Sequence, residues 1–328
     1  MKIAIVGASG MVGRMFLKVL EEKNLEQHEY VLFCSQNSAG KKVKFMGKEY
    51  EFLELNEKVF NEKFDFALFS AGAEVSKKYA PLFVNAGCIV IDNSSCWRMD
   101  PKVPLVVPEV NIEEAFKNKG IIANPNCSTI QAVVALKPIH DAYKIKRIVF
   151  STYQAVSGAG QKGYDDLKNG IDGIEPKKFP HPIFGNCLPH IDSFLENGYT
   201  KEEMKMINET QKILNDYTIK ITSTTVRVPV YHGHSEAINL ELEKDFSIND
   251  IYDLYEKSPG IVVQDNIAKN IYPMPITSEG YDEVFIGRIR RDYSVNSGLN
   301  LWVVADNIRK GAATNAVSIL EKMLQNYE

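Results

Sequence analysis

Short apolar runs alternate with amphipathic stretches along the first third of the chain. We expect four strands, at residues 2–6, 30–34, 64–70 and 88–92. We expect helices between them, one with Phe16, Leu17 and Leu20 on a single side and another at 76–85. Strands that alternate with helices predict an α/β fold with a parallel, doubly wound sheet, and the ligands of such a sheet bind at the carboxyl ends of its strands.

The pattern continues differently after residue 125. Helical spacing runs over 128–143, and we expect Ser128 or Thr129 to cap this helix. Residues 148–152 read as a strand. Strict alternation after residue 236 predicts another strand, whose start is interrupted by the triplet His232-Gly233-His234.

Composition sets the broad class of protein. The chain has 328 residues, 45% of them hydrophobic, which is enough for about two domains. A net charge of -4 favours neither nucleic acid nor an anionic membrane as a partner. No apolar run approaches the roughly 20 residues that span a bilayer, and the glycines near the N-terminus come too early for a signal peptide. We therefore expect a cytoplasmic protein.

Glycines follow the first predicted strand in the order GxxGxxG. They are part of the run Gly7, Ala8, Ser9, Gly10, Met11, Val12 and Gly13, which leads directly into the first predicted helix. A strand, a glycine loop and a helix together cradle a dinucleotide, because glycines let the backbone approach the pyrophosphate and the helix N-terminus supplies N–H groups. The alternative is a glycine-rich turn without a ligand.

The end of the second predicted strand indicates which dinucleotide binds. A site for NAD often has an acid here to bond the ribose 2′-hydroxyl. This chain instead has hydroxyls, amides and two lysines, in the run Ser35, Gln36, Asn37, Ser38, Ala39, Gly40, Lys41 and Lys42. These groups suit a 2′-phosphate, so the sequence favours NADP. A solvated loop would also explain the lysines.

Cys127 is the strongest candidate for a nucleophile among the five cysteines. It stands in NPNCST at the start of a predicted helix, where the helix dipole favours a thiolate. Cys34 and Cys88 lie at strand ends and look like packing residues, while Cys96 and Cys187 lie in loops. The odd number of cysteines and the lack of CxxC spacing argue against disulfides and a zinc site, so we expect no metal.

A thiolate nucleophile usually works with an acid or base, and His234 is a candidate for that role. A glycine between His232 and His234 suggests a bulge or a close backbone approach, and Arg227 lies seven residues before His234. The alternative is a polar strand end near the surface. The stretch 154–160, rich in small residues, could lie against a ring or a phosphate, or could be a flexible turn.

Eight motifs occur in order over nearly the whole chain: GASGMVG, SQNSAGK, NSSCWR, NPNCST, QAVSGAG, EEMK, VRVPVYHGHSEA and DNIRKGAATNA. In these motifs the chain resembles the aspartate-β-semialdehyde dehydrogenases of the bacterial type. The resemblance implies that Cys127 becomes an acyl-thioester, that His234 is the acid/base and that Gln154 orients the substrate. It also implies that Arg227 binds the substrate carboxylate and that Glu202 contacts the substrate amine.

The same resemblance assigns a phosphate site and a cofactor site. Arg98 and Lys205, with Asn126 nearby, correspond to the residues that bind inorganic phosphate. The implied contacts to NADP are Gly7, Ser9, Gly10, Met11, Val12, Gly13, Ser35, Asn37, Ser38, Ser157, Gly158 and Asn307. Many members have an arginine where this chain has Gln36 and Asn37, which weakens the grip on a 2′-phosphate and makes use of NAD plausible as well.

The resemblance further implies the domains and the reaction. Residues 1–125 would form the NADP-binding domain, completed by a helix at 309–328, and residues 126–308 a catalytic and dimerisation domain of a homodimer or homotetramer. The enzyme would interconvert L-aspartate 4-semialdehyde and L-4-aspartyl phosphate, in the biosynthesis of lysine (through diaminopimelate), threonine and methionine.

Three other functions compete with this one. An N-acetyl-γ-glutamyl-phosphate reductase shares the architecture, but Glu202 argues against it, because an acetylated amine carries no charge. A non-catalytic NADP sensor would need neither a nucleophile nor a second anion site. A cysteine hydrolase would not explain the glycine loop.

Overall fold

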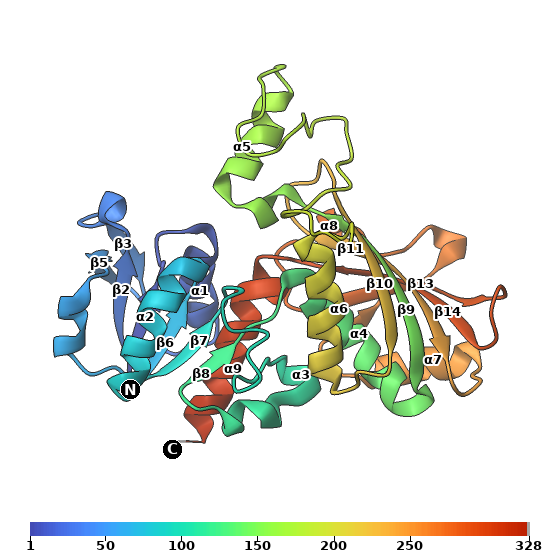
Figure 1. Ribbon diagram of the computed structural model, residues 1–328, viewed down its shortest axis with the longest axis horizontal. Coiled ribbons are helices and arrows are strands. Elements are labelled where there is room, and N and C mark those ends of the chain that lie inside the picture. Colours follow the sequence, from blue (N-terminus) through green and yellow to red (C-terminus); the bar gives the residue numbers. More distant parts are fainter. Residues whose placement is uncertain (327–328) are drawn as a thin grey trace. The chain divides into compact units, whose positions relative to one another are not determined.

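The computed structural model describes residues 1–326, so the last two residues of the predicted helix 309–328 lie outside the described part of the chain. The chain divides into two compact units (Figure 1). Unit 1 comprises Met1–Pro125 and the C-terminal segment from Ala312, and unit 2 comprises Asn126–Gly311. Within residues 1–326, no helix has the length and apolar character that a membrane span requires.

Unit 1 contains a six-stranded, all-parallel sheet in the order β5-β2-β1-β6-β7-β8. The strands are β1 (Lys2–Val6), β2 (Glu29–Cys34), β5 (Leu53–Glu54), β6 (Phe66–Phe69), β7 (Ile89–Asp92) and β8 (Ile121–Ala123). The order reverses at β1, as in dinucleotide-binding sheets. The predicted fold class is therefore confirmed, and each of the four predicted strands is present with ends shifted by at most two residues.

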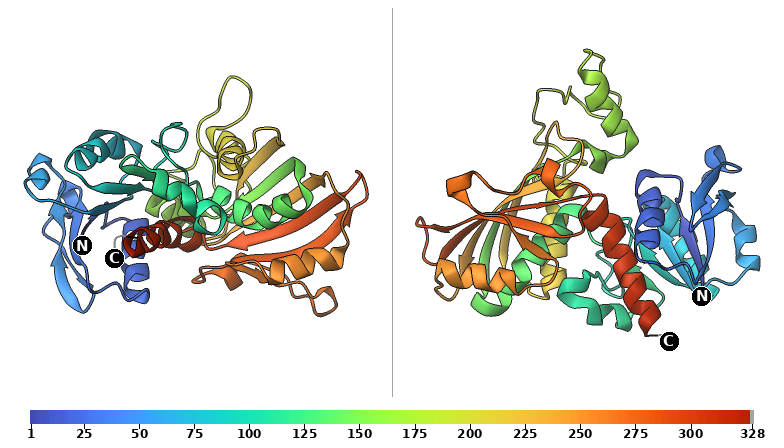
Figure 2. Two further views of the ribbon diagram at one scale, coloured as in Figure 1. Left: turned by 90° about the horizontal axis from the view of Figure 1, so that it is seen from below. Right: turned by 180° about the vertical axis from the view of Figure 1, so that it is seen from behind.

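Helices bury both faces of this sheet, which is why most residues of its central strands are apolar. Ile3 and Ile5 face a core shared with α1 (Met11–Glu22) and α9 (Thr314–Gln325), and Figure 2 shows α9 as the long C-terminal helix. Ala4 and Val6 face the opposite core, which includes α2 (Ala73–Asn85). The predicted C-terminal helix is thus two elements, because residues Arg309–Ala313 form a π-turn before α9 begins.

The other elements of unit 1 are short. They are the hairpin β3 (Lys42–Phe45) and β4 (Lys48–Glu51), the helix α3 (Pro108–Asn111), and the 3-10 turns η1 (Gln36–Ser38), η2 (Glu57–Asn61) and η3 (Ile112–Lys117).

Unit 2 contains a mixed six-stranded sheet in the order β10-β9-β11-β14-β13-β12. The strands are β9 (Ile145–Gln154), β10 (Lys220–Arg227), β11 (His234–Leu242), β12 (Ile261–Val263), β13 (Val284–Asp292) and β14 (Gly298–Ala305). Alternate residues of β9 to β11 are buried on one face, which α4 (Cys127–Tyr143) and α6 (Lys201–Leu214) cover. The helix α7 (Ile248–Glu256) packs beside α4.

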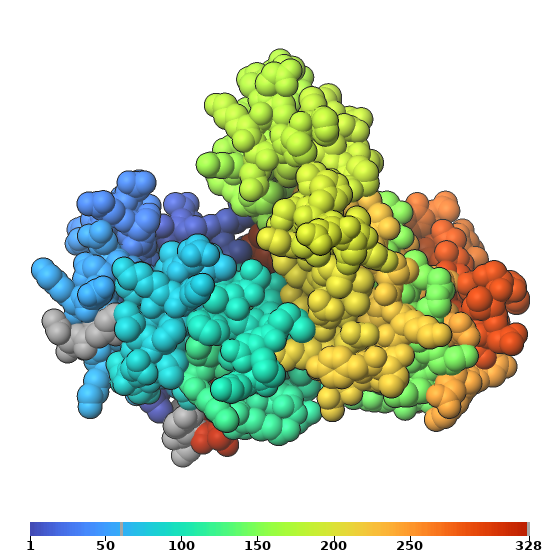
Figure 3. Space-filling view, viewed as in Figure 1, coloured from blue at the N-terminus to red at the C-terminus, as the bar shows by residue number. Residues whose placement is uncertain are grey.

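The remaining elements of unit 2 lie in its connections. They are α5 (Gln161–Gly170), α8 (Pro275–Ser278), and the 3-10 turns η4 (Val156–Ala159) and η5 (Ile267–Lys269). In the space-filling view of Figure 3, the yellow-green segment around α5 stands out from the rest of unit 2.

The glycine loop after β1 can be tested through Gly7. Its φ is +86°, and a Cβ added there would lie 2.3 Å from the carbonyl oxygen of Ser70. Gly40 has a similar φ of +79° but nothing within 4 Å of an added Cβ. Alanine costs about 1–2 kcal/mol at either position for its backbone conformation, and the clash adds about 1–3 kcal/mol only at position 7. We expect Gly7→Ala to lower Tm clearly more than Gly40→Ala in thermal unfolding. Equal losses would show that the close approach to Ser70 is relieved at no cost.

Candidate active site

Cys127 is the first residue of α4, and the side chain before it caps the helix. Oδ1 of Asn126 accepts hydrogen bonds from the backbone N–H groups of Ser128 at 3.0 Å and of Thr129 at 3.4 Å. The prediction that Ser128 or Thr129 is the cap is therefore wrong, because both residues lie inside the first turn and their amides are the groups being capped. The thiol itself lies at the positive end of the helix dipole, as predicted.

The thiol of Cys127 contacts the imidazole of His234, with Sγ 3.2 Å from Nε2. His234 is fully buried at the start of β11. Its Nδ1 accepts a hydrogen bond from the backbone N–H of Ala155 at 3.0 Å. Since that nitrogen is an acceptor, the neutral ring carries its hydrogen on Nε2, where it faces the sulfur.

The electrostatic surroundings keep His234 neutral. The pKa of His234 is lowered to about 3, chiefly by burial and also by the positive charge of Arg227, against a smaller opposing effect of Glu202. The imidazole is therefore uncharged at neutral pH and has an N–H available to the sulfur of Cys127.

Arg227 lies at the end of β10, beside Gln154 at the end of β9, and His234 begins the next strand. We call these three residues the catalytic row. Nη1 of Arg227 donates to the carbonyl oxygen of Ala155 at 2.6 Å. Nε of Arg227 is buried and has no hydrogen-bond partner within residues 1–326, so the guanidinium has a donor left for a ligand.

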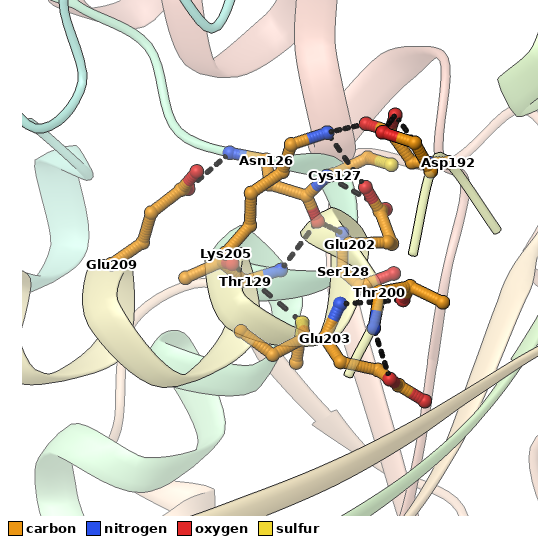
Figure 4. A network of polar contacts seen from close by, with 12 residues as sticks. Asn126, Cys127, Ser128, Thr129, Asp192, Thr200, Glu202, Glu203, Lys205 and Glu209 are labelled. Atoms are coloured by element: carbon orange, nitrogen blue, oxygen red, sulfur yellow. Dashed lines mark hydrogen bonds and ion pairs between the residues drawn. The ribbon is translucent and has the colours of Figure 1, made fainter. Parts of the chain in front are cut away.

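The carboxylate of Glu202 is bonded to three other side chains of the site, two of which, Asn126 and Lys205, are labelled in Figure 4. Oε1 of Glu202 accepts from Nδ2 of Asn126 at 2.8 Å and from Nε2 of Gln154 at 3.1 Å. Oε2 accepts from Nζ of Lys205 at 3.0 Å, and Lys205 also pairs with Asp192 at 2.9 Å. Burial alone would raise the pKa of Glu202, but the charge of Lys205 and these amides hold it below its usual range. Glu202 is therefore ionised.

Small residues make room for this arrangement. A Cβ at Gly158 would lie 3.0 Å from Nη1 of Arg227 and 3.3 Å from Cε1 of His234. A Cβ at Gly311 would lie 2.8 Å from Cβ of Cys127. Within the stretch 154–160, residues Val156–Ala159 form a 3-10 turn in which Val156 and Ser157 are buried.

The predicted cofactor residues fall in both units. Gly7 to Gly13 and Ser35 to Ser38 lie in unit 1, where each follows the carboxyl end of a strand. Gly10 caps α1 without a side-chain hydrogen bond, so the loop offers backbone N–H groups at this end of the helix. In unit 2, Asn307 accepts from the backbone N–H of Gly233 at 2.9 Å, and its Nδ2 donates to Oγ of Ser157 at 3.0 Å.

Among the residues predicted for the site, the structure brings seven together in unit 2: Asn126, Cys127, Gln154, Glu202, Lys205, Arg227 and His234. Arg98 lies in unit 1, where its Nε and Nη2 donate to the carbonyl oxygens of Asn124 and Asn93.

The sequence analysis missed Asp192, which lies in an irregular segment without periodicity. It also missed the capping role of Asn126, although an asparagine before a helix is a usable signal.

The chain matches two family models, which together define a semialdehyde dehydrogenase. One, "Semialdehyde dehydrogenase, NAD binding domain", matches residues 2–118, and the other, "Semialdehyde dehydrogenase, dimerisation domain", matches residues 136–310. The chain is also 58% identical to an aspartate-semialdehyde dehydrogenase of Aquifex aeolicus, over 99% of this chain and 98% of that protein.

Solved structures agree with this likeness. Aspartate semialdehyde dehydrogenase II of Vibrio cholerae, in complex with ASA, superposes with a TM-score of 0.96 at 47% identity, over 100% of this chain and 99% of that one. The Candida albicans enzyme with NADP gives a TM-score of 0.77 at 26% identity, over 98% of each chain. The chain belongs to the aspartate-semialdehyde dehydrogenase family, whose members are oxidoreductases of amino-acid biosynthesis, and the resemblance stated from the motifs is confirmed.

The buried histidine can be tested through its titration. The folded-state pKa of His234, about 3, lies below the ordinary value of 6.5, so the unfolded chain takes up the proton first as the pH falls. This contribution to stability is present above pH 6.5 and is lost as the pH falls towards 3. We expect NMR of labelled imidazoles to show His234 neutral at pH 5, with the resonance assigned by its absence in His234→Gln. Protonation of His234 near pH 6.5 would contradict the described electrostatics.

Proposed function

We propose that this protein catalyses the reversible, phosphate-dependent oxidation of L-aspartate 4-semialdehyde to L-4-aspartyl phosphate with NADP, through an acyl-thioester on Cys127. The contact between Sγ of Cys127 and Nε2 of His234, 3.2 Å, carries the proposal. A nucleophile within hydrogen-bond reach of a base, with that base oriented by a third group, is the arrangement that covalent catalysis requires. Here the third group is the backbone N–H of Ala155.

Two side chains account for the nucleophile and for the hydrogen bond to the negative charge that develops on the substrate. The thiolate of Cys127 attacks the aldehyde carbon and forms the alkoxide of a thiohemiacetal, whose oxygen accepts a hydrogen bond from the Nε2–H of His234. When this carbon gives up a hydride it becomes the thioester carbon, and no proton remains on its oxygen to be removed. Phosphate attacks the thioester carbon and releases the thiolate, so one acyl–sulfur bond breaks as the acyl–phosphate bond forms. NADP, when bound, supplies the hydride acceptor.

The glycine loop of unit 1 fits a dinucleotide. Gly7 lies so close to Ser70 that no side chain fits, and the N-terminus of α1 has backbone N–H groups and no side-chain cap. For the 2′-phosphate, no acid ends β2, and Ser35, Ser38 and Lys41 follow it. Lys42 supports this assignment less, because it pairs with Glu49 at 2.7 Å. The relative from Candida albicans that was solved with NADP supports the same choice.

The charges in unit 2 suit an amino-acid semialdehyde. Nε of Arg227 is a buried donor for the α-carboxylate, and ionised Glu202 supplies the negative charge for the α-ammonium. Lys205 supplies a cation for phosphate. The assignment of Arg98 to phosphate rests on its motif alone. The dimerisation-domain match supports an oligomer, which we propose to be a homodimer or a homotetramer.

Two alternatives fit less well. An N-acetyl-γ-glutamyl-phosphate reductase would place an uncharged amide against the ionised, buried Glu202. A sensor that only binds NADP would leave the pair of Cys127 and His234 without a use.

The deciding experiment is an assay of phosphate-dependent NADP⁺ reduction with aspartate semialdehyde, run beside N-acetylglutamate semialdehyde and repeated with NAD⁺. We expect turnover with the first substrate and a higher kcat/KM for NADP⁺. Cys127→Ser should lower kcat by about three orders of magnitude or more, because a hydroxyl is a far weaker nucleophile than a thiolate, while NADP binding measured by calorimetry persists. Near-normal turnover in Cys127→Ser would refute the thioester, and a preference for NAD⁺ would refute the cofactor assignment.

The two arginines are expected to have separate duties. Lysine keeps the charge but loses the bidentate fork, which costs on the order of 1.5–3 kcal/mol, more than tenfold in affinity. Arg227→Lys should therefore raise the KM for aspartate semialdehyde, and Arg98→Lys the KM for phosphate. Each substrate is varied with the others saturating, for both variants. If both variants respond alike to the two substrates, the arginines form one shared anion site instead.

A further inference from the structure

A second polar row lies directly behind the catalytic row on the same face of the unit 2 sheet. Thr225 of β10 is paired with Thr152 of β9, and Thr152 with Glu236 of β11. The row ends at Val303 of β14. Thr152, Thr225 and Glu236 are all fully buried. A row of this kind has no direct part in the proposed chemistry, so its polar groups need another explanation.

The second row reaches the catalytic row through one hydrogen bond. Oγ1 of Thr152 donates to Oε1 of Gln154 at 3.0 Å, which leaves Nε2 of Gln154 directed at Glu202. The side chain of Gln131, on α4, donates to the backbone carbonyl of His234 at 3.3 Å, so α4 lies over the start of β11. A change in the second row would therefore alter the position of Gln154 and of the start of β11, where His234 lies.

Glu236 is the unusual member of the row. Within the described residues 1–326, neither of its carboxyl oxygens has a hydrogen-bond partner. Buried, unpartnered oxygens are also found on Thr225, on Ser128 and Gln131 of α4, and on Thr210 of α6. An ionised carboxylate in such a place would be strongly destabilising, whereas a neutral acid can join a set of hydroxyls through ordered water.

The charged groups around the row do not neutralise Glu236. His234 on its own strand is neutral, Arg227 donates to Ala155, and Lys205 pairs with Glu202 and Asp192. Glu203 of α6 accepts from the backbone N–H of Thr225 and so brings a further negative charge to this side. Val303 brings none. Burial raises the pKa of Glu236 well above its usual range, in agreement with this geometry.

We propose that Glu236 is a positioning residue that works as a neutral carboxylic acid. It is bridged by ordered water to the hydroxyls of the second row, and it thereby fixes Thr152 and Gln154 while adding no negative charge behind His234. A carboxylate at that position would stabilise the imidazolium and raise the pKa of His234, against the neutral state of the ring described above. The functional part of this inference rests on the proposed function, but the protonation state does not.

The first test reads the proton directly and needs no turnover. In infrared difference spectra of the wild type against Glu236→Gln at neutral pH, we expect the carbonyl band of a protonated acid that the variant lacks. A difference that shows only carboxylate bands would overturn the proposal.

The second test uses stability against pH, with Glu241→Gln as the matched control on the same strand. Above pH 4.5 the unfolded chain ionises Glu236 while the fold keeps its proton, so the wild type loses stability as the pH rises towards the raised pKa of the folded state. The Tm of Glu236→Gln minus that of wild type should therefore increase with pH. Glu241 pairs with Lys146 at 2.7 Å and its pKa is lowered, so above pH 4.5 it is ionised in both states and its difference should stay flat. A flat or falling difference for Glu236→Gln would contradict the neutral acid.

The third test reads positioning. Glu236→Leu removes the polar partner and should lower kcat by about tenfold or more, because misplaced groups lose much of their effect. Glu236→Gln is neutral and polar and should restore kcat to within about twofold of wild type, with the limbs of the pH–rate profile unmoved. If Glu236→Leu is fully active, or if Glu236→Gln shifts the acid limb, the positioning role is wrong. Absence of turnover in every form, wild type included, would instead count against the proposed function and leave the first two tests in force.

Discussion

The hydrogen bond from the backbone N–H of Ala155 to Nδ1 of His234 is the interaction on which the site depends. It decides which nitrogen carries the hydrogen, and so decides that an N–H rather than a lone pair faces the sulfur of Cys127. The turn Val156–Ala159 holds Ala155 in place, and the carbonyl of the same residue receives Arg227. The backbone of one residue, Ala155, thus orients both His234 and Arg227 through its N–H and its carbonyl oxygen.

The N-terminus of α4 determines the position of Cys127. The sulfur is located by the first residue of α4, and Asn126 uses its side chain twice, to cap the helix and to reach Glu202. Because the cap is itself a member of the recognition network, the position of the nucleophile and the position of the substrate groups are set by a common part of the chain. Strand register does the same for the catalytic row, where neighbouring strands in one sheet cannot slip independently.

The sequence was sufficient for the architecture of unit 1, because apolar runs that are buried on both faces and a glycine loop are strong local signals. It also placed Cys127 at a helix start. It was not sufficient for contacts between distant segments, because no local pattern links Glu202 to Gln154. Nor does any local pattern predict the positive φ of Asp192, which is +68°. The helix cap was misplaced by two or three residues, since serine and threonine are as good caps as asparagine and only the backbone decides among them. The site residues were assembled by a motif resemblance more than by local physics.

The shared carboxylate of Glu202 has a consequence for how this enzyme family can change. Asn126, Gln154 and Lys205 all bond to it, so a substitution at any of the four leaves partners unsatisfied at the others. Effects of substitutions in such a network do not add. Exchange of Glu202 alone would therefore remove the common acceptor of three side chains as well as a charge. A redesign of this part of the site would have to change several of these residues together.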